Sequence, residues 1–145
     1  MAEKNEIEIV EDFLKALEAA DFDAAEALLD EKVIYQNVPL PADQGKQAVL
    51  ETLKRFGLII DQFEVITHNI AANGSVVLTE RTDIISGPGL RLEFWVCGTF
   101  EVKNGKITLW RDYFDWATLG REIAVSLPGF AFEAAAKLAG SLLGR

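Results

Sequence analysis

The stretch FEVKNGKITLWRDYFDW, residues Phe100 to Trp116, contains the pattern that decides the fold. Asn104-Gly105 separates two runs rich in β-branched and aromatic residues, and Asn-Gly between such runs is the strongest short-range signal of a β-hairpin. Earlier in the chain, Asn73-Gly74 and the sequence SGPG at 86–89 mark two more turns. The strands expected between these turns are Gln62–Ala71, Ser75–Ile85, Leu90–Val102 and Lys106–Trp116.

The residues before this strand meander mostly favour helix. Apolar residues at helical spacing predict an amphipathic helix near the N-terminus. Asp23 and Glu26 are spaced as a capping box, which predicts a second, short helix. The elements expected in this half are a helix over 7–17, a short helix in DFDAAEALLD (21–30), a strand in EKVIYQNVPLP (31–41) that its prolines end, and a helix over 46–56.

Helices followed by a meander of long strands are typical of an α+β protein. A single curved sheet, mixed or antiparallel, closed on one face by the N-terminal helices would form a cone with a pocket inside. The length of 145 residues favours a single domain over residues 1–145, because a chain of this size can bury one sizeable core. The tail from Ala117 favours helix but is interrupted at Pro128-Gly129.

Charge and rare residues exclude several classes of function. The net charge of −9 argues against nucleic acid or an anionic membrane as a partner, since both attract lysine and arginine. Cys97 is the only cysteine, and its apolar neighbours predict a buried thiol. His68 is the only histidine, and phosphate-binding loops are absent, so neither a metal nor a cofactor is expected. Without a signal peptide or an apolar run of about 18 residues, a cytoplasmic location is expected.

Three of the predicted strands each place polar side chains on one face among apolar residues, because residues two apart in a strand point the same way. Each pattern alone has an ordinary structural explanation, such as an outward face, an ion pair or a strand end. The groups are Tyr35 with Asn37, Arg81 with Asp83, and Asp112 with Trp110, Phe114 and Trp116.

Together the three groups indicate chemistry. If the strands converge, one cavity holds two carboxylates, an arginine between them, a phenol and an amide. Aromatic walls would raise the pKa of Asp112 and make it a better proton acceptor near neutral pH. Two carboxylates beside one cation can differ in protonation, and a phenol with an amide can hold a water molecule. This equipment is suited to adding water to a substrate.

The motifs IYQNVPLP, ERTD, FWVCGTFEV and ITLWRDYFDW resemble those of limonene-1,2-epoxide hydrolases, in this order and spacing. The resemblance extends from the first helix to about Trp116. It implies the cone-shaped α+β fold shared with nuclear transport factor 2-like and SnoaL-like proteins, and a homodimer. It also implies that the substrates are water and a small apolar epoxide, terpenoid-like or cyclic, and that the product is a vicinal diol.

The resemblance also assigns roles. Asp112 would be the general base that deprotonates a water held by Tyr35 and Asn37. Asp83 would be the general acid that protonates the epoxide oxygen, and Arg81 would bridge the two carboxylates. All five residues match the motif.

Two other functions fit the same cone. An isomerase or cyclase could use a basic aspartate beside a protonated one, as in ketosteroid isomerase. A non-catalytic ligand-binding module is the second alternative, because fold alone does not fix function. The arginine between two carboxylates favours the hydrolase. Apolar positions that could shape the pocket are Leu40, Val49, Leu53, Leu78, Phe94 and Leu109.

Overall fold

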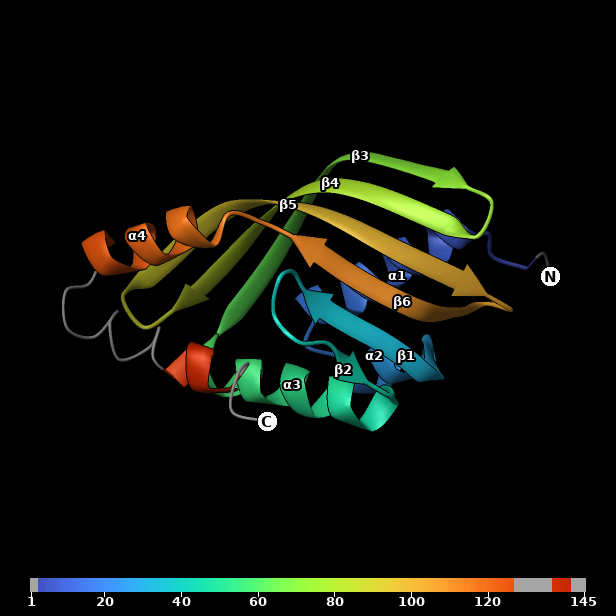
Figure 1. The fold of residues 1–145 in the computed structure, drawn as a ribbon, viewed down its shortest axis with the longest axis horizontal. Coiled ribbons are helices and arrows are strands. Elements are labelled where there is room, and N and C mark those ends of the chain that lie inside the picture. Colours follow the sequence, from blue (N-terminus) through green and yellow to red (C-terminus); the bar gives the residue numbers. More distant parts are fainter. Residues whose placement is uncertain (1–2, 127–136, 142–145) are drawn as a thin grey trace.

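The computed structural model describes residues 3–126 and 137–141 of the chain (Figure 1). The helices are α1 (Glu6–Glu18), α2 (Phe22–Ala27), α3 (Lys46–Ile59) and α4 (Trp116–Ser126). The strands are β1 (Leu29–Asn37), β2 (Asp43–Gln44), β3 (Gln62–Asn73), β4 (Val76–Gly87), β5 (Leu90–Lys103) and β6 (Lys106–Tyr113). Pro128-Gly129, predicted to interrupt the tail, lies outside the described residues. No helix within the described ranges is long and apolar enough to cross a membrane.

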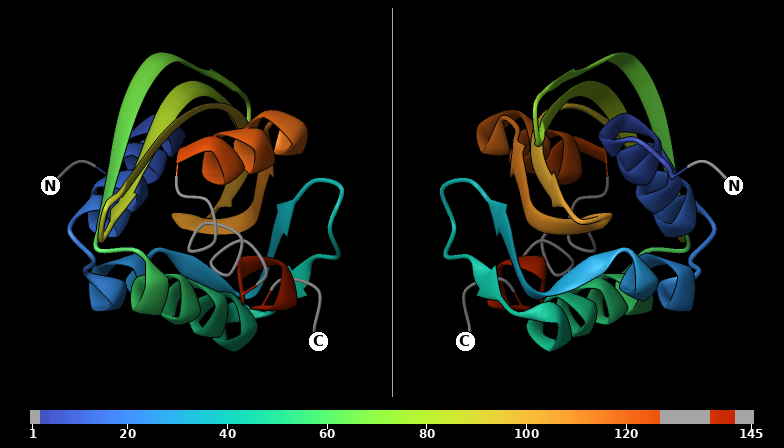
Figure 2. Two further views of the ribbon diagram at one scale, coloured as in Figure 1. Left: turned by 90° about the vertical axis from the view of Figure 1, so that its left-hand side faces the viewer. Right: turned by 90° about the vertical axis from the view of Figure 1, so that its right-hand side faces the viewer.

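One curved sheet forms the body of the molecule, with strand order β2-β1-β6-β5-β4-β3. Strand β1 runs parallel to β6, whereas the other neighbouring pairs are antiparallel, so the sheet is mixed. The sheet arches over the interior, with α1 along one side and α3 below (Figure 2). Helix α4 lies against β5 (Figure 1). The predicted α+β cone is confirmed.

The turn between β5 and β6 has the conformation that its residues favour. Asn104 and Gly105 both have positive φ, at 54° and 75°. A two-residue hairpin of type I′ needs positive φ at both central positions, and Asn-Gly adopts it at the lowest cost. The turn sets the pairing of Lys103 with Lys106 and of Val102 with Ile107. The register then shifts by one residue between Val102 and Glu101, which pairs with Leu109.

The core lies between α1 and the inner face of the sheet. Phe13 of α1 is fully buried and meets Trp110 of β6 edge-on, with ring centroids 5.0 Å apart. Its ring also meets Phe100 of β5, at 6.5 Å. Burying one such side chain contributes roughly 1.5–3 kcal/mol, so this cluster holds α1 on the sheet and fixes the Trp110 ring within it.

Two of the predicted boundaries were wrong for the same reason. Others shifted by a few residues: α3 ends at Ile59 and not at 56, and β1 begins at Leu29 and not at 31. The cap of α2 is Asp21, whose side chain accepts a hydrogen bond from Ala24 N, and not the predicted Asp23. Strand β6 ends at Tyr113 and not at Trp116, because Asp115 accepts hydrogen bonds from the backbone of the next helix, α4. In both places an aspartate begins a helix close to, but not at, the boundary that composition alone had indicated.

The predicted burial of Cys97 was also wrong. Its side chain is exposed, on the outer face of β5 beside Trp95, which is 63% exposed. Val96 points inward instead and is buried. In the apolar run FWVCG both faces of the strand carry apolar residues, so composition alone could not identify the inner one.

Candidate active site

The strand register brings the predicted polar residues together. Asn37 of β1 pairs with Asp112 of β6, and Asp112 pairs with Gly98 of β5. Gly98 in turn pairs with Thr79 of β4, so these positions form one row across the sheet. Arg81 lies two residues beyond Thr79 on the same face of β4. Side chains from different parts of the chain therefore meet inside the cone.

Arg81 bridges two buried carboxylates. Its Nε and Nη2 donate to the two oxygens of Asp83, at 3.0 and 2.9 Å. Its Nη1 donates to Asp112 Oδ1 at 3.2 Å, and its Nη2 lies 3.2 Å from Asp112 Oδ2. The three residues are 1%, 4% and 5% exposed, in the order Arg81, Asp83, Asp112. The planar guanidinium thus presents one edge to each carboxylate, which lysine could not do.

Burial controls the electrostatics of this cluster. It raises the pKa of Asp112, and the charge of Arg81 opposes that rise without cancelling it. For Arg81, burial acts to lower the pKa, but Asp112 and Asp83 outweigh it, so the guanidinium stays charged. One cation between two carboxylates leaves a net negative charge when both are ionised. Loss of that charge by proton uptake is therefore easier at Asp112 than at an exposed aspartate.

Tyr35 and Asn37 lie beside Asp112 on the neighbouring strand. Asn37 Nδ2 donates to the Tyr35 hydroxyl oxygen at 2.8 Å. Burial, followed by the charge of Asp112, raises the pKa of Tyr35, so its phenol is neutral and keeps a proton to donate. The pair can therefore offer both donors and an acceptor to a small polar molecule next to Asp112.

Trp110 links the site to the core. Its Nε1 donates to Asp112 Oδ2 at 3.1 Å, while its ring stacks on Tyr35 with centroids 3.9 Å apart. The rigid indole ring of Trp110 thus orients both the carboxylate of Asp112 and the phenol ring of Tyr35. The two aspartates of ITLWRDYFDW have separate tasks: Asp112 faces the interior, and Asp115 caps α4 on the surface.

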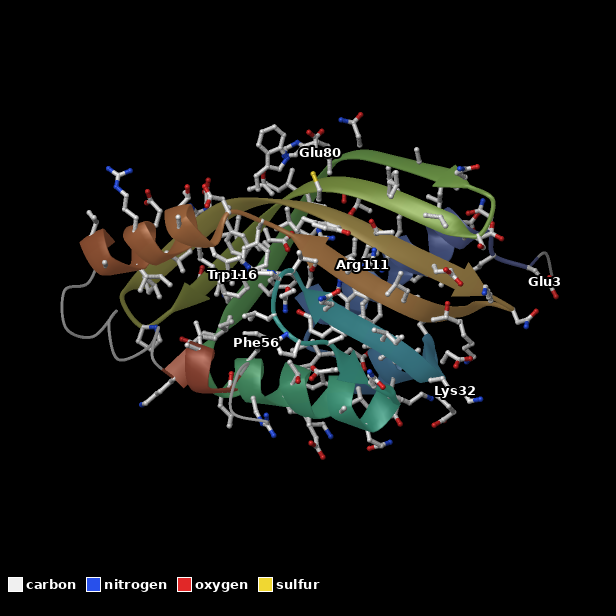
Figure 3. All side chains as sticks on the ribbon, in the orientation of Figure 1. Glu3, Lys32, Phe56, Glu80, Arg111 and Trp116 are labelled. Carbon is white, nitrogen blue, oxygen red and sulfur yellow. The ribbon has the colours of Figure 1, made fainter. Side chains whose placement is uncertain are left out.

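A cavity of about 230 Å³ opens onto this cluster. All five predicted site residues border it, and most of its remaining wall is apolar. Phe56 borders the cavity from the inner side of α3, and Trp116 borders it from the start of α4 (Figure 3). The main apolar wall residues are Leu53, Phe56, Leu92, Phe94, Phe114, Trp116, Leu119 and Ile123.

Of the six apolar positions expected to shape the pocket, only Leu53 and Phe94 border it. Leu78 lies on the outer face of β4 and is exposed, so its prediction was wrong. Val49 is buried in the main core cluster instead. His68 is exposed and hydrogen-bonded to Thr82, away from the cavity. Among the described residues, no group of three or more His, Cys, Asp or Glu side chains is placed to hold a metal ion.

Sequence reasoning missed the contributions of Thr79 and Gly98. Thr79 Oγ1 accepts a hydrogen bond from Arg81 Nη1 at 3.1 Å. Gly98 passes directly beneath the guanidinium. The available signal was a single glycine inside the long run LRLEFWVCGTFEVK, because glycine in a strand interior often marks a close approach by another group.

A cone-shaped α+β fold around an apolar cavity defines the broad class of nuclear transport factor 2-like proteins. Solved structures that share the fold include an NTF2-like protein of Burkholderia pseudomallei K96243, with a TM-score of 0.74 at 16% identity over 82% of this chain and 97% of that chain. Another is a SnoaL-like protein of Shewanella putrefaciens CN-32, with a TM-score of 0.78 at 15% identity over 85% of this chain and 88% of that chain. At these identities the likeness concerns the fold alone.

Within this class the family is well defined. The model of the limonene-1,2-epoxide hydrolase catalytic domain matches residues 4–124. Epoxide hydrolase EphG of Mycobacterium tuberculosis is 50% identical over 107 residues, which cover 73% of this chain and 70% of that protein. The structure of an LEH-like epoxide hydrolase of M. tuberculosis has a TM-score of 0.78 at 41% identity, over 88% of this chain and 96% of the other. The chain belongs to the limonene-1,2-epoxide hydrolase family, a family of epoxide hydrolases, and the predicted membership is confirmed.

Proposed function

We propose that this protein hydrolyses a small apolar epoxide, terpenoid-like or otherwise cyclic, to a vicinal diol in one step, without a metal. The observation that carries the proposal is Arg81 clamped between two buried carboxylates at the wall of an apolar cavity. A binding module has no need of this costly arrangement. An isomerase has no need of a guanidinium that joins its acid to its base.

Water activation is assigned to the β1 and β6 side of the site. A water held by Tyr35 and Asn37 would lie next to Asp112, its proton acceptor. The raised pKa of Asp112 supports this role, because a general base works best when its pKa approaches the working pH. Trp110 and Arg81 occupy the other approaches to the carboxylate and hold its plane fixed.

Ring opening is assigned to the β4 side. As the water oxygen bonds to one ring carbon, the bond from that carbon to the oxirane oxygen breaks. Asp112 takes a proton from the water, and Asp83 gives a proton to the oxirane oxygen, so the product is a neutral diol. Both oxygens of Asp83 accept from Arg81, but each carboxyl oxygen has a second lone pair that can carry the proton toward the cavity. The proton then returns to Asp83 from Asp112, through Arg81 or solvent.

The wall of the cavity supports an apolar substrate. Helices α3 and α4 and the first half of β5 contribute aliphatic and aromatic side chains. Phe114 packs there against both Phe94 and Trp116. A substrate with a second charged or strongly polar group would leave that group without a partner against these residues. The reactive oxygen is thus the single polar feature that the site is suited to hold.

A single turnover in ¹⁸O-water, with enzyme in excess over a cyclic epoxide, tests this proposal. Direct attack by water places heavy oxygen in the first diol formed, whereas an aspartyl ester would deliver ordinary protein oxygen on that cycle. We expect labelled diol, detected by mass spectrometry, and an unchanged rate after dialysis against a chelator. Unlabelled first-turnover product would refute the one-step route. Absence of diol over a panel of cyclic epoxides would refute the function.

We also propose a homodimer formed through the outer face of the sheet. That face carries exposed apolar side chains on β3 to β6, and a patch of this kind marks an interaction surface. Glu80 lies on the same outer side (Figure 3). The exposed apolar residues are Ile66, Leu78, Trp95 and Tyr113.

Light scattering after size exclusion should give twice the mass of one chain for the unmodified protein. Trp95→Glu should give the mass of one chain, since a buried, unpaired charge would oppose pairing. Leu58→Glu is the matched control, because Leu58 is exposed on α3, away from this face. A monomeric unmodified protein would contradict the proposal, as would a Trp95→Glu dimer.

A further inference from the structure

We propose that Gly98 is a positioning residue. The absence of a side chain there creates the space in which the guanidinium of Arg81 reaches Asp112, and Thr79 accepts a hydrogen bond from Nη1 of that guanidinium. The inference rests on the proposed function, because it concerns the same three charged residues. It adds residues that contact neither water nor epoxide and act only through Arg81.

The row across the sheet explains why this position matters. Gly98 lies between Thr79 on one neighbouring strand and Asp112 on the other. Both of those side chains point into the cone, so a side chain at Gly98 would point there too, between them. Arg81 fills this gap: its Nη1 donates to Thr79 Oγ1 at 3.1 Å and to Asp112 Oδ1 at 3.2 Å.

The gap is too small for even one methyl group. A Cβ atom on Gly98 would lie 2.5 Å from Arg81 Nη1, 2.8 Å from Asp112 Oδ1 and 2.8 Å from Thr79 Oγ1. All three distances are shorter than real Cβ contacts allow. The backbone at Gly98 is not in the left-handed region, so conformational freedom does not explain the glycine. The need for space beside the guanidinium of Arg81 explains it.

The guanidinium cannot move aside without losing contacts. Arg81 is almost fully buried, and its Nε, Nη1 and Nη2 are all engaged by Asp83, Asp112 and Thr79. Displacing Nη1 breaks its bonds to Asp112 and Thr79. Because the guanidinium is rigid and planar, the same rotation draws Nη2 away from Asp112 Oδ2, while Nε stays paired with Asp83. The expected result of Gly98→Ala is therefore a folded protein in which Arg81 no longer bridges the two carboxylates.

Displacing the guanidinium of Arg81 should change the pKa of Asp112 in a defined direction. The ionisable groups that act on Asp112 are Arg81 and Asp83 from β4, and Tyr35 from β1 interacts with it as well. Of these, Arg81 lowers the pKa of Asp112 and Asp83 raises it. Moving Arg81 away raises the pKa of Asp112 further. The acidic limb of the pH profile of kcat should therefore shift to higher pH, since Asp112 must be ionised to act as the base. A merely structural defect would lower activity without moving that limb.

The test compares Gly98→Ala with Gly120→Ala, which makes the same change in α4 where no atom lies within 4 Å of the added Cβ. We expect Gly98→Ala to lower kcat about 10²-fold, because a misplacement of about 1 Å can have that effect. KM should change by no more than about threefold, since the apolar wall is intact. A ¹³C NMR titration of Asp112 should show its raised pKa without any turnover. Gly120→Ala should behave like the unmodified protein in every measurement.

A second pair of variants covers the case in which Gly98→Ala fails to fold by circular dichroism. Thr79→Val keeps the shape and removes the acceptor of Arg81 Nη1, so kcat should fall about tenfold, with the acidic limb again shifted. Thr79→Ser should recover most of that loss. The proposal is overturned if folded Gly98→Ala, or Thr79→Val in its place, keeps both the kcat and the acidic limb of the unmodified protein. Failure of the unmodified protein to form diol would instead refute the proposed function, and the NMR titration would still decide the role of Gly98.

Discussion

Asp112→Asn is expected to lower diol formation by at least about 10²-fold, since general base catalysis typically contributes 10²–10⁴-fold. The amide keeps the shape of the carboxylate, and its single oxygen can accept from Trp110 and from Arg81 Nη2 at the position of Oδ2, while its nitrogen replaces Oδ1. The amide takes no proton from water near neutral pH. The loss should therefore appear in kcat, with KM little changed. Initial rates of diol formation measured by gas chromatography provide the test.

The same variant should be about as stable as the unmodified protein, because two effects oppose each other: Arg81 Nη1 loses its acceptor, and a buried carboxylate is removed. Burial raises the pKa of Asp112 above its ordinary value, so the folded state favours the protonated form. The contribution of Asp112 to folding stability is therefore greatest when the pH is below the pKa that this residue has in the unfolded chain. The contribution is lost as the pH rises through the higher pKa of the folded state. Asparagine removes that loss while giving up the bond from Arg81 Nη1, so the thermal midpoint at pH 7 should change little. A large fall in midpoint would mean that the activity loss reflects unfolding.

Asp115→Asn is the matched control, because Asp115 lies in the same stretch but on the surface at the start of α4. It should keep nearly full activity. In the unmodified protein the acidic limb of kcat should lie above the ordinary pKa of an aspartate, since the base must be ionised to act. Substantial turnover by Asp112→Asn, or a limb at the ordinary aspartate value, would exclude Asp112 as the base.

Asp83→Asn is expected to reduce turnover by a comparable factor, at least about 10²-fold, because the oxirane oxygen would leave without a proton. The amide can still accept one hydrogen bond from Arg81, so the guanidinium should remain near Asp112. The loss should be smallest for epoxides whose ring opens to a stabilised cation and largest for unactivated ones. Rates across such a series provide the measurement.

Glu80→Gln is the control for Asp83→Asn. Glu80 lies on the same strand, on its outer face, where it accepts from Asn69 (Figure 3). It should leave turnover within about twofold of the unmodified rate, because the amide oxygen can still accept from Asn69 and the change lies outside the cavity. If Asp83→Asn showed the same small effect, the acid would have to be sought elsewhere in the cavity.

Features that depend on local spacing could be predicted from the sequence. Asn-Gly pairs predicted the turns, and the two-residue period placed Arg81 with Asp83 on one face of β4. The convergence of these residues with Asp112 and Tyr35 is confirmed by the register of the strands. Their catalytic roles remain predictions, since geometry shows proximity and not turnover.

Features that depend on contacts between distant segments could not be predicted. Cys97 and Leu78 were misplaced because β4 and β5 carry apolar residues on both faces. The packing of α1 against these strands determines which face is inside. The role of Gly98 becomes visible only when Thr79 and Asp112 are known to flank it. Pairing across a sheet is non-local, so no window of sequence contains it.

The division of labour between elements bears on how the enzyme could be altered. The residues proposed to hold water and transfer protons all come from β1, β4 and β6. The apolar wall residues Leu53 and Phe56 come from α3, and Leu119 and Ile123 come from α4. Reshaping the helical wall therefore leaves the charged cluster and its hydrogen bonds intact. Substrate preference and stereochemical outcome can be evolved on one set of elements while the reaction itself is preserved on another. Libraries confined to α3 and α4 should accordingly retain a high fraction of active members.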